Sequence, residues 1–331
     1  MNVFPKYGLA ILALLLPVGL AAQSNDSLLV WPGPPDPARI RHIRTISSMG
    51  DFKHEKGFFA KLVSFLTGGE STLPWLVQPV GIAVSADGRI FVADPGAHGI
   101  HVINPEKKEY DFVKETKYGM LISPVGLALT EDGRLYVSDS ERGDVIVLDD
   151  DLEAEAQIKG SLVRPTGLQI IGGKLYVVDT GRHEVVVFDL KGNVMLEFGR
   201  HGAGAGEFNY PIHLAGRDSV YVVDALNYRI QKFDPAGKFG SAFGDRGDIP
   251  GRFASPKSIA LDSQGHVYVT DALMDNFQIF TAYGQLLLIV GRKGASDGEF
   301  MSPGGIAIDR NDRVYVVDTL NKRVQIFQFI K

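Results

Sequence analysis

Six aspartates recur at a regular spacing and could act together chemically. They are Asp94, Asp139, Asp179, Asp224, Asp271 and Asp318, and each ends a short apolar run such as IFVAD or VYVVD. A ring of carboxylates could hold a hard cation through oxygen ligands. Aspartate also accepts hydrogen bonds from backbone N–H groups of a following turn. Arg229 and Arg323 each follow one of these aspartates by five residues, where they could pair with it. We therefore predict that the ring is structural.

Three histidines, His98, His183 and His213, raise a second chemistry, because three imidazoles are the ligand set of an open catalytic zinc site. They fall in different repeats, and nothing in their spacing brings them together. We predict neither a bound metal nor another cofactor. The chain has no cysteine, which excludes disulfides, thiolate metal sites and a cysteine nucleophile. It also has no G-x-S-x-G turn to support a serine hydrolase.

The elements that carry these residues are copies of one unit. Each copy begins at a proline, and the prolines lie 41 to 47 residues apart: Pro79, Pro124, Pro165, Pro211, Pro256 and Pro303. An apolar run such as GIAV or GLAL follows, then a polar turn such as ADGR or EDGR, then the run that ends in aspartate. A third run and a weaker fourth run complete most copies. Repeats of about 45 residues are typical of propeller blades.

These runs are short and rich in Val, Ile, Tyr and Phe, so we predict strands rather than helices. The Asp-Gly and Gly-Gly turns between them supply the positive φ angles of tight hairpins. Each unit is therefore a four-stranded antiparallel sheet. The fold class is all-β, a six-bladed β-propeller.

The last copy, SPGGIAIDRNDRVYVVDTLNKRVQIF, closely resembles the NHL repeat. Six such copies over about residues 76–331 resemble an NHL β-propeller of the exported bacterial type. The resemblance implies a fold and no particular activity. Amidating lyases of similar architecture carry metal-binding histidines just after the repeat proline, but this chain has Val80, Val125, Thr166, Ile212, Lys257 and Gly304 there. No catalytic residue of lactonase-like propellers carries over either.

In such a blade, the loop into the first strand and the loop between the second and third strands lie on one face, which we call the loop-rich face. The other turns form the turn face. Basic residues gather in the loops of the loop-rich face, whereas aspartates and glutamates are frequent in the turns of the turn face. We take as candidate ligand-binding residues Arg142, Arg182, His183, Arg229, Arg292, Lys322 and Arg323.

Charge and composition narrow the function. The net charge is −5 and the pI is near 5.9, so no global basic field predicts nucleic-acid binding. We expect a binding or scaffold protein rather than an enzyme, one that engages a protein or an anionic polymer through its loop-rich face. The alternative is a metal-assisted lyase or lactonase at the mouth of the central channel.

The N-terminal residues predict export. Residues 1–22 carry Lys6 before the apolar stretch GLAILALLLPVGLAA and read as a signal peptide, so the protein is expected in the periplasm or outside the cell. An uncleaved membrane anchor is the alternative. Residues 23–38, with WPGPPDP, are expected to be a stiff extended linker.

The propeller is expected to span residues 39–331. Its sixth copy ends after three clear strands and leaves an open edge. We predict that residues 39–48 close the ring, with residues 40–47 paired to residues 324–328. Residues 56–67 have a helical apolar face, which predicts an inserted amphipathic helix. This face is formed by Phe58, Phe59, Leu62, Phe65 and Leu66. It is expected to pack across the propeller, with docking to a membrane or a partner as the alternative.

Overall fold

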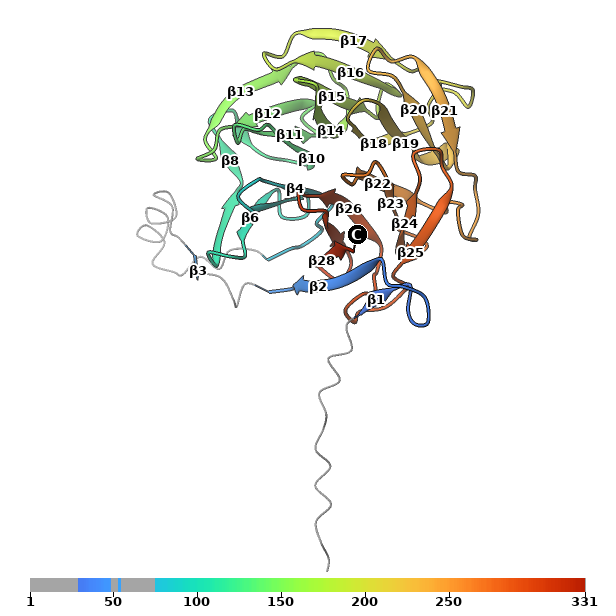
Figure 1. Ribbon diagram of the computed structural model, residues 1–331. Coiled ribbons are helices and arrows are strands. Elements are labelled where there is room, and N and C mark those ends of the chain that lie inside the picture. The colour runs from blue at the N-terminus through green and yellow to red at the C-terminus, as the bar shows by residue number, and fades with distance from the viewer. Residues whose placement is uncertain (1–28, 49–52, 55–74, 331) are drawn as a thin grey trace, which may run out of the picture.

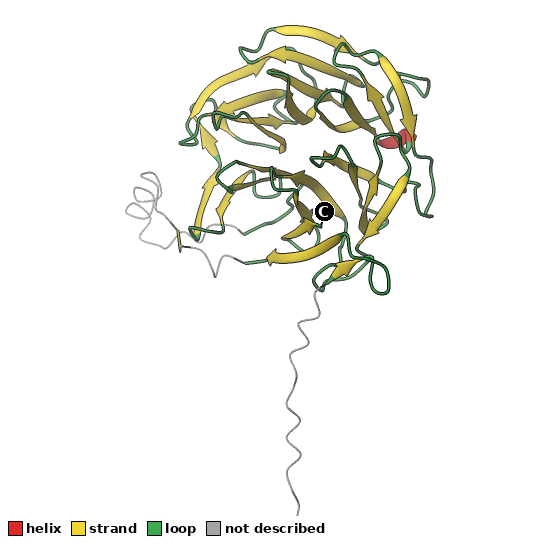
Figure 2. Ribbon diagram, in the orientation of Figure 1, coloured by secondary structure: helices red, strands yellow, loops and turns green. Residues whose placement is uncertain are grey.

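The computed structural model describes residues 29–48, 53–54 and 75–330, and these form a ring of six blades around a central channel (Figure 1). Nearly all regular structure is β-strand (Figure 2). The predicted six-bladed, all-β propeller is confirmed. The signal peptide predicted over residues 1–22 and the helix predicted over residues 56–67 lie outside the described residues. Within the described part, no helix is long and apolar enough to span a membrane.

Each blade is an antiparallel sheet whose first strand is innermost. Blade 1 has β4 (Gly81–Val84), β5 (Ile90–Asp94), β6 (Gly99–Asn104) and β7 (Glu109–Val113), with β3 (Lys53–His54) parallel to β7. Blade 2 has β10 (Pro124–Leu129), β11 (Leu135–Asp139), β12 (Asp144–Leu148) and β13 (Ala154–Lys159). Blade 3 has β14 (Pro165–Ile171), β15 (Lys174–Asp179), β16 (Glu184–Asp189) and β17 (Val194–Phe198).

The second half of the ring repeats this order. Blade 4 has β18 (Pro211–Gly216), β19 (Val220–Asp224), β20 (Arg229–Phe233) and β21 (Phe239–Phe243), with the 3-10 turn η2 (Ala225–Asn227) after β19. Blade 5 has β22 (Pro256–Leu261), β23 (Val267–Asp271), β24 (Asn276–Phe280) and β25 (Leu286–Val290). Blade 6 has β26 (Pro303–Ile308), β27 (Arg313–Asp318), β28 (Arg323–Phe329), β2 (Ile40–Ile46) and β1 (Val30–Trp31). A small hairpin, β8 (Glu115–Thr116) and β9 (Gly119–Met120), lies between blades 1 and 2.

The ring closes where the sequence predicts. Strand β2 pairs antiparallel with β28, from Ile40 opposite Phe329 to Ile46 opposite Val324. Because the two strands come from opposite ends of the propeller sequence, this pairing removes the open edge of blade 6. The buried Ile40 joins the apolar cluster between blades 5 and 6.

Part of the segment expected to be an extended linker is ordered against blade 6. Val30 and Trp31 form β1, which pairs with β2, and the proline-rich residues 32–38 connect the two strands. The Trp31 ring meets Phe327 edge-on at 5.7 Å between ring centroids. The proline-rich segment thus connects β1 to β2, and the contact between Trp31 and Phe327 holds β1 against blade 6.

The apolar core lies between neighbouring blades. One cluster combines Tyr136 and Val147 of blade 2 with Leu175 and Val177 of blade 3, and the other five clusters are built in the same way. The second and third strands of the blades are almost entirely buried. Full burial of a large aliphatic or aromatic side chain contributes about 1.5–3 kcal/mol. The ring therefore gives its loops a rigid base.

Candidate functional site

The six repeat aspartates are completely buried and hold the loops of the loop-rich face. Each carboxylate accepts at least one backbone N–H group from the loop that enters its own blade. Asp94, for example, accepts from Val77 at 2.6 Å and from Gln78 at 2.9 Å. Burial alone would raise the Asp94 pKa, but hydrogen bonds from His101 and from backbone N–H groups outweigh it and lower that pKa. The prediction that these aspartates are structural is confirmed.

Two of the predicted ligand-binding arginines complete this scaffold. Arg229 donates to Asp224 at 2.8 Å and to the carbonyl oxygens of Gly204 and Glu207. The nearly buried Arg323 donates to Asp318 at 2.7 Å and to three carbonyl oxygens of the loop over residues 295–299. The predicted pairings five residues apart are confirmed. These guanidinium groups clamp the loops and present few free donors to a ligand.

Arg142 and Arg182 make a different internal contact in blades 2 and 3. Each pairs with the acid two residues later, Arg142 with Asp144 at 3.0 Å and Arg182 with Glu184 at 2.8 Å. Arg142 also donates to two carbonyl oxygens of the hairpin formed by β8 and β9. Burial raises the pKa of Glu184, and Arg182 opposes that rise.

Of the seven candidate residues, only Arg292 and Lys322 have a strongly exposed charged side chain. The Arg292 side chain is 83% exposed, although it pairs with Glu299 at 3.1 Å. Lys322 is exposed and has no side-chain partner among the described residues. The structure does not bring the seven residues together at one point, since they are distributed over blades 2, 3, 4 and 6.

The three histidines do not converge. His98 and His183 occupy the same place in their blades, the fourth residue after the repeat aspartate, where φ is positive (54° and 58°). Each side chain contacts the next blade: His98 Nδ1 lies 2.6 Å from the Ile122 carbonyl oxygen, and His183 Nδ1 accepts the Tyr210 N–H at 3.0 Å. Burial, together with the nearby His201, lowers the pKa of His183.

His213 lies instead in the channel wall, on β18. Its Nδ1 accepts the Ile259 N–H of blade 5 at 3.4 Å, and burial lowers its pKa to about 4. Across the described residues, no three His, Asp or Glu side chains are placed to hold one metal ion. The histidines therefore link blades.

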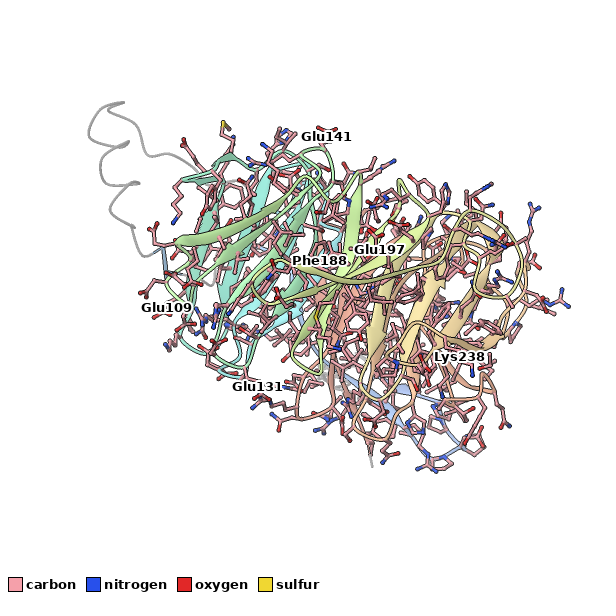
Figure 3. All side chains as sticks on the ribbon, turned by 90° about the horizontal axis from the view of Figure 1, so that it is seen from above. Glu109, Glu131, Glu141, Phe188, Glu197 and Lys238 are labelled. Atoms are coloured by element: carbon pink, nitrogen blue, oxygen red, sulfur yellow. The ribbon has the colours of Figure 1, made fainter. Side chains whose placement is uncertain are left out.

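A row of exposed leucines runs over blades 4 to 6 on the loop-rich face. Leu226, Leu273 and Leu320 each stand two residues after the repeat aspartate, and they are 51%, 73% and 62% exposed. We call these three residues the leucine arc. Figure 3 shows the disc edge-on, with Glu141 of the loop-rich face on one side and Glu131 and Lys238 of the turn face on the other.

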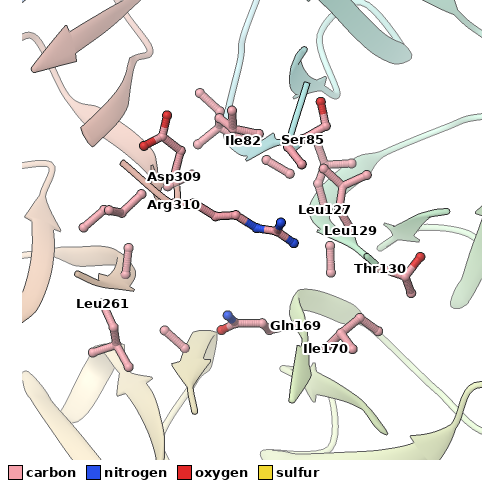
Figure 4. Close-up of a pocket in the computed structure, with 18 of the residues that line it drawn as sticks. Ile82, Ser85, Leu127, Leu129, Thr130, Gln169, Ile170, Leu261, Asp309 and Arg310 are labelled. Atoms are coloured by element: carbon pink, nitrogen blue, oxygen red, sulfur yellow. The ribbon is translucent and has the colours of Figure 1, made fainter. Parts of the chain in front are cut away.

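The central channel holds a cavity of about 760 Å³ that opens on the turn face. It is lined by the innermost strands and by turns such as residues 85–89 and 309–313. Near the loop-rich end, glycines two residues after the proline let these strands approach each other: a Cβ on Gly81 would overlap the Val125 carbonyl oxygen. Figure 4 shows Arg310 extending into the middle of the channel, with Gln169 across from it.

Comparison with known proteins identifies the repeat. The family model for the NHL repeat matches residues 300–327, which include the end of the entry loop, β26, β27 and most of β28 in blade 6. The other five blades share the proline, the strand pattern and the buried aspartate. The chain is an NHL-repeat, six-bladed β-propeller.

Curated relatives match a limited part of this NHL propeller. The human E3 ubiquitin-protein ligase NHLRC1 is 34% identical over 95 residues, which are 28% of this chain and 24% of the ligase. The rat protein of the same name is 33% identical over the same length. The chain thus spans about a quarter of the relatives it matches.

Solved structures share the fold with proteins of different functions. An auxiliary nutrient binding protein from Bacteroides thetaiotaomicron has a TM-score of 0.62 at 15% identity, over 78% of this chain and 70% of that one. A gluconolactonase from Xanthomonas campestris has 0.61 at 15% identity, over 77% and 87%. A streptogramin B lyase has 0.57 at 12% identity, over 75% and 78%. At these identities the likeness establishes the propeller alone.

The leucine arc and the cavity are the features that sequence reasoning missed. A signal for the first existed: two residues after the aspartate, blades 1 to 3 have Gly96, Glu141 and Gly181, whereas blades 4 to 6 all have leucine. No comparable signal marks the cavity, because its lining alternates apolar wall residues with ordinary turn residues.

Proposed function

We propose that this NHL propeller is a binding protein that holds a partner protein on the loop-rich face of blades 4 to 6. The leucine arc is the observation that carries the proposal. A leucine more than half exposed stands at the same position of three successive blades. We infer that the three side chains act together as apolar anchors for one partner, because apolar side chains gathered on one face mark protein interaction sites. An anionic polymer alone would have no use for it, so we favour a protein.

The charged groups around the leucine arc indicate the chemistry of the partner. Arg252, Lys257, Lys293 and Lys322 are exposed on this face and have no ion pair among the described residues. The exposed acids here are fewer. Asp297 accepts the Thr45 hydroxyl at 2.6 Å, whereas Asp245 and Asp248 have no ion pair among the described residues. A partner segment that combines apolar and acidic side chains would complement both features, because opposite charges steer association and suppress wrong partners.

The loops that carry this surface are held in place before any partner arrives. Gln231, Gln278 and Gln325 occupy equivalent positions, and each side-chain oxygen accepts a loop N–H at 2.8 to 3.0 Å. Phe208, Phe253 and Phe300 anchor the same loops in the core. A preorganised surface lowers the entropy cost of binding. The alternative, a metal-assisted lyase or lactonase, gains no support from the dispersed histidines.

Site-specific photo-crosslinking tests the proposal. Leu273 is replaced by a photoreactive phenylalanine analogue in cells that naturally make the protein, and crosslinked products are identified by mass spectrometry. The matched control carries the analogue at Leu287, which is 47% exposed on the outer strand β25. We expect one protein adduct from position 273 that position 287 does not give. No adduct at 273, or the same adduct from both positions, would contradict the proposal.

A further inference from the structure

The cavity on the turn face contains hydrogen-bond donors that the propeller itself does not use. The innermost strands are free edges of their sheets, so backbone N–H and C=O groups line the channel. Five blades place an alanine four residues after the repeat proline, and blade 3 places Gln169 there. Gln169 Oε1 accepts the Gly216 N–H at 3.0 Å. This contact fixes the amide orientation, and the Nε2 group has no partner among the described residues.

Two arginines add positive charge at the mouth of the cavity. Arg310 is 70% exposed and reaches the channel centre, where its nearest acid is Glu131 at 3.6 Å (Figure 4). Arg217 lines the cavity and is exposed, with no side-chain partner within the described part of the chain. His213 contributes a neutral imidazole: its Nδ1 is an acceptor, so the proton lies on Nε2.

The acids at the same mouth are already engaged. Arg89 pairs with Asp87 and Asp150, and Arg313 pairs with Asp309 at 2.7 Å. Positive and negative residues are similar in number here, so the mouth has no strong net field. The mouth differs in its hydrogen-bonding capacity instead. Donor groups remain available to a ligand, whereas most of the carboxylate acceptors are already paired within the protein.

We propose that this cavity binds a small hydroxylated carboxylate, with its carboxylate on Arg310 and its polar groups on Gln169 and the strand edges. A volume of about 760 Å³ lies within the range of small-molecule sites. Arginine recognises carboxylates through two parallel N–H donors. A ligand carboxylate would take up these donors in place of the exposed Glu131, whose oxygen lies 3.6 Å from the guanidinium. The site lies on the face opposite the leucine arc and is independent of it.

Calorimetric titration with citrate tests this site, with sodium chloride at matched ionic strength as the reference. We expect wild-type protein to bind citrate, and Arg310→Met to weaken binding at least about tenfold. Gln169→Ala, which gives blade 3 the alanine of the other blades, should weaken it about threefold. Glu131→Gln should tighten binding, because it removes the competing carboxylate. Lys238→Met, on the turn face outside the cavity, should bind as wild type does.

Three results would overturn the proposal. The first is a wild-type protein that gives no more heat with citrate than with chloride. The second is an Arg310→Met variant that binds citrate as tightly as wild type. The third is a Lys238→Met variant that loses binding as much as Arg310→Met does. Circular dichroism on each variant checks that the fold is intact. Because the Arg310 side chain is 70% exposed, its replacement removes no core contact. Glu131→Gln tests for a gain in affinity that misfolding could not produce.

Discussion

Asn276 in blade 5 occupies the position that Arg323 occupies in blade 6, five residues after the repeat aspartate. Arg323 bonds Asp318 and clamps the loop over residues 295–299. The Asn276 Oδ1 is buried and has no hydrogen-bond partner among the described residues. A buried acceptor without a donor costs roughly 1–3 kcal/mol. Blade 5 therefore lacks the clamp that holds the corresponding loops of blades 4 and 6.

Replacing Asn276 by arginine should stabilise the propeller. The guanidinium would reach Asp271 and the carbonyl groups of residues 245–253, as Arg323 does in blade 6. We expect Tm to rise by about 2–4 °C, the effect of roughly 1 kcal/mol in a large domain. The reverse change, Arg323→Asn, should lower stability by about 3–5 kcal/mol because it leaves Asp318 buried without its cation. An Asn276→Arg variant that melts at or below the wild-type temperature would show that blade 5 cannot accept the clamp.

A second prediction concerns the stability that two isoleucines of the closing strand β2 contribute. Ile40 is fully buried, whereas Ile43 lies at an irregularity in the pairing and is 46% exposed. Ile40→Ala should lower the free energy of unfolding by about 2–4 kcal/mol, and Ile43→Ala by less than about 1 kcal/mol. Urea unfolding measures both. Equal losses of stability in the two variants would contradict the structure, in which Ile40 of β2 is part of the core and Ile43 is not.

The fold could be predicted from the sequence because each blade repeats the same local rules. The sixth copy begins at Pro303 and lacks a fourth strand, so residues 324–328 needed a partner strand from elsewhere in the chain. The structure supplies it, with Ile46 opposite Val324. The buried aspartates followed in the same way, since a buried carboxylate needs donors and the nearest ones are loop N–H groups.

The candidate site could not be predicted as well, because a charged residue in a loop does not reveal its partner. Arg142 and Arg182 are neutralised by acids two residues later, and Arg323 is folded back under a loop. An exposed leucine in a turn such as Leu320 is similarly ambiguous until its burial is known. The sequence predicted on which face of the propeller these residues lie. Whether their side chains are free to contact a ligand depends on tertiary contacts that the sequence does not show.

Acid should destabilise the propeller through His213. Its pKa in the folded protein is about 4, against 6.5 for an ordinary imidazole, because burial disfavours the charged form. Between these values the unfolded chain binds the proton first, so stability falls as the pH falls from about 6.5 to about 4. The loss should reach at most about 3 kcal/mol.

The variant His213→Ser isolates this contribution, because blade 5 carries Ser258 at the same position. Burial also lowers the pKa values of His42 and His183. Both histidines are present in wild type and in the variant, so the acid sensitivity that they cause is the same in the two proteins. Urea unfolding near neutral pH and again near pH 5 should show a smaller loss in the variant than in wild type. The same loss in both proteins would place the acid sensitivity elsewhere.

The most direct test of the binding account is the affinity of the protein captured through position 273. Its Kd is measured for wild type, for Leu226→Glu/Leu273→Glu/Leu320→Glu and for the control Leu287→Glu. Loss of three apolar contacts and the added negative charge should weaken binding by at least about a hundredfold, while the control should bind normally. A triple variant that binds as tightly as wild type would contradict the proposal that the leucine arc holds the partner.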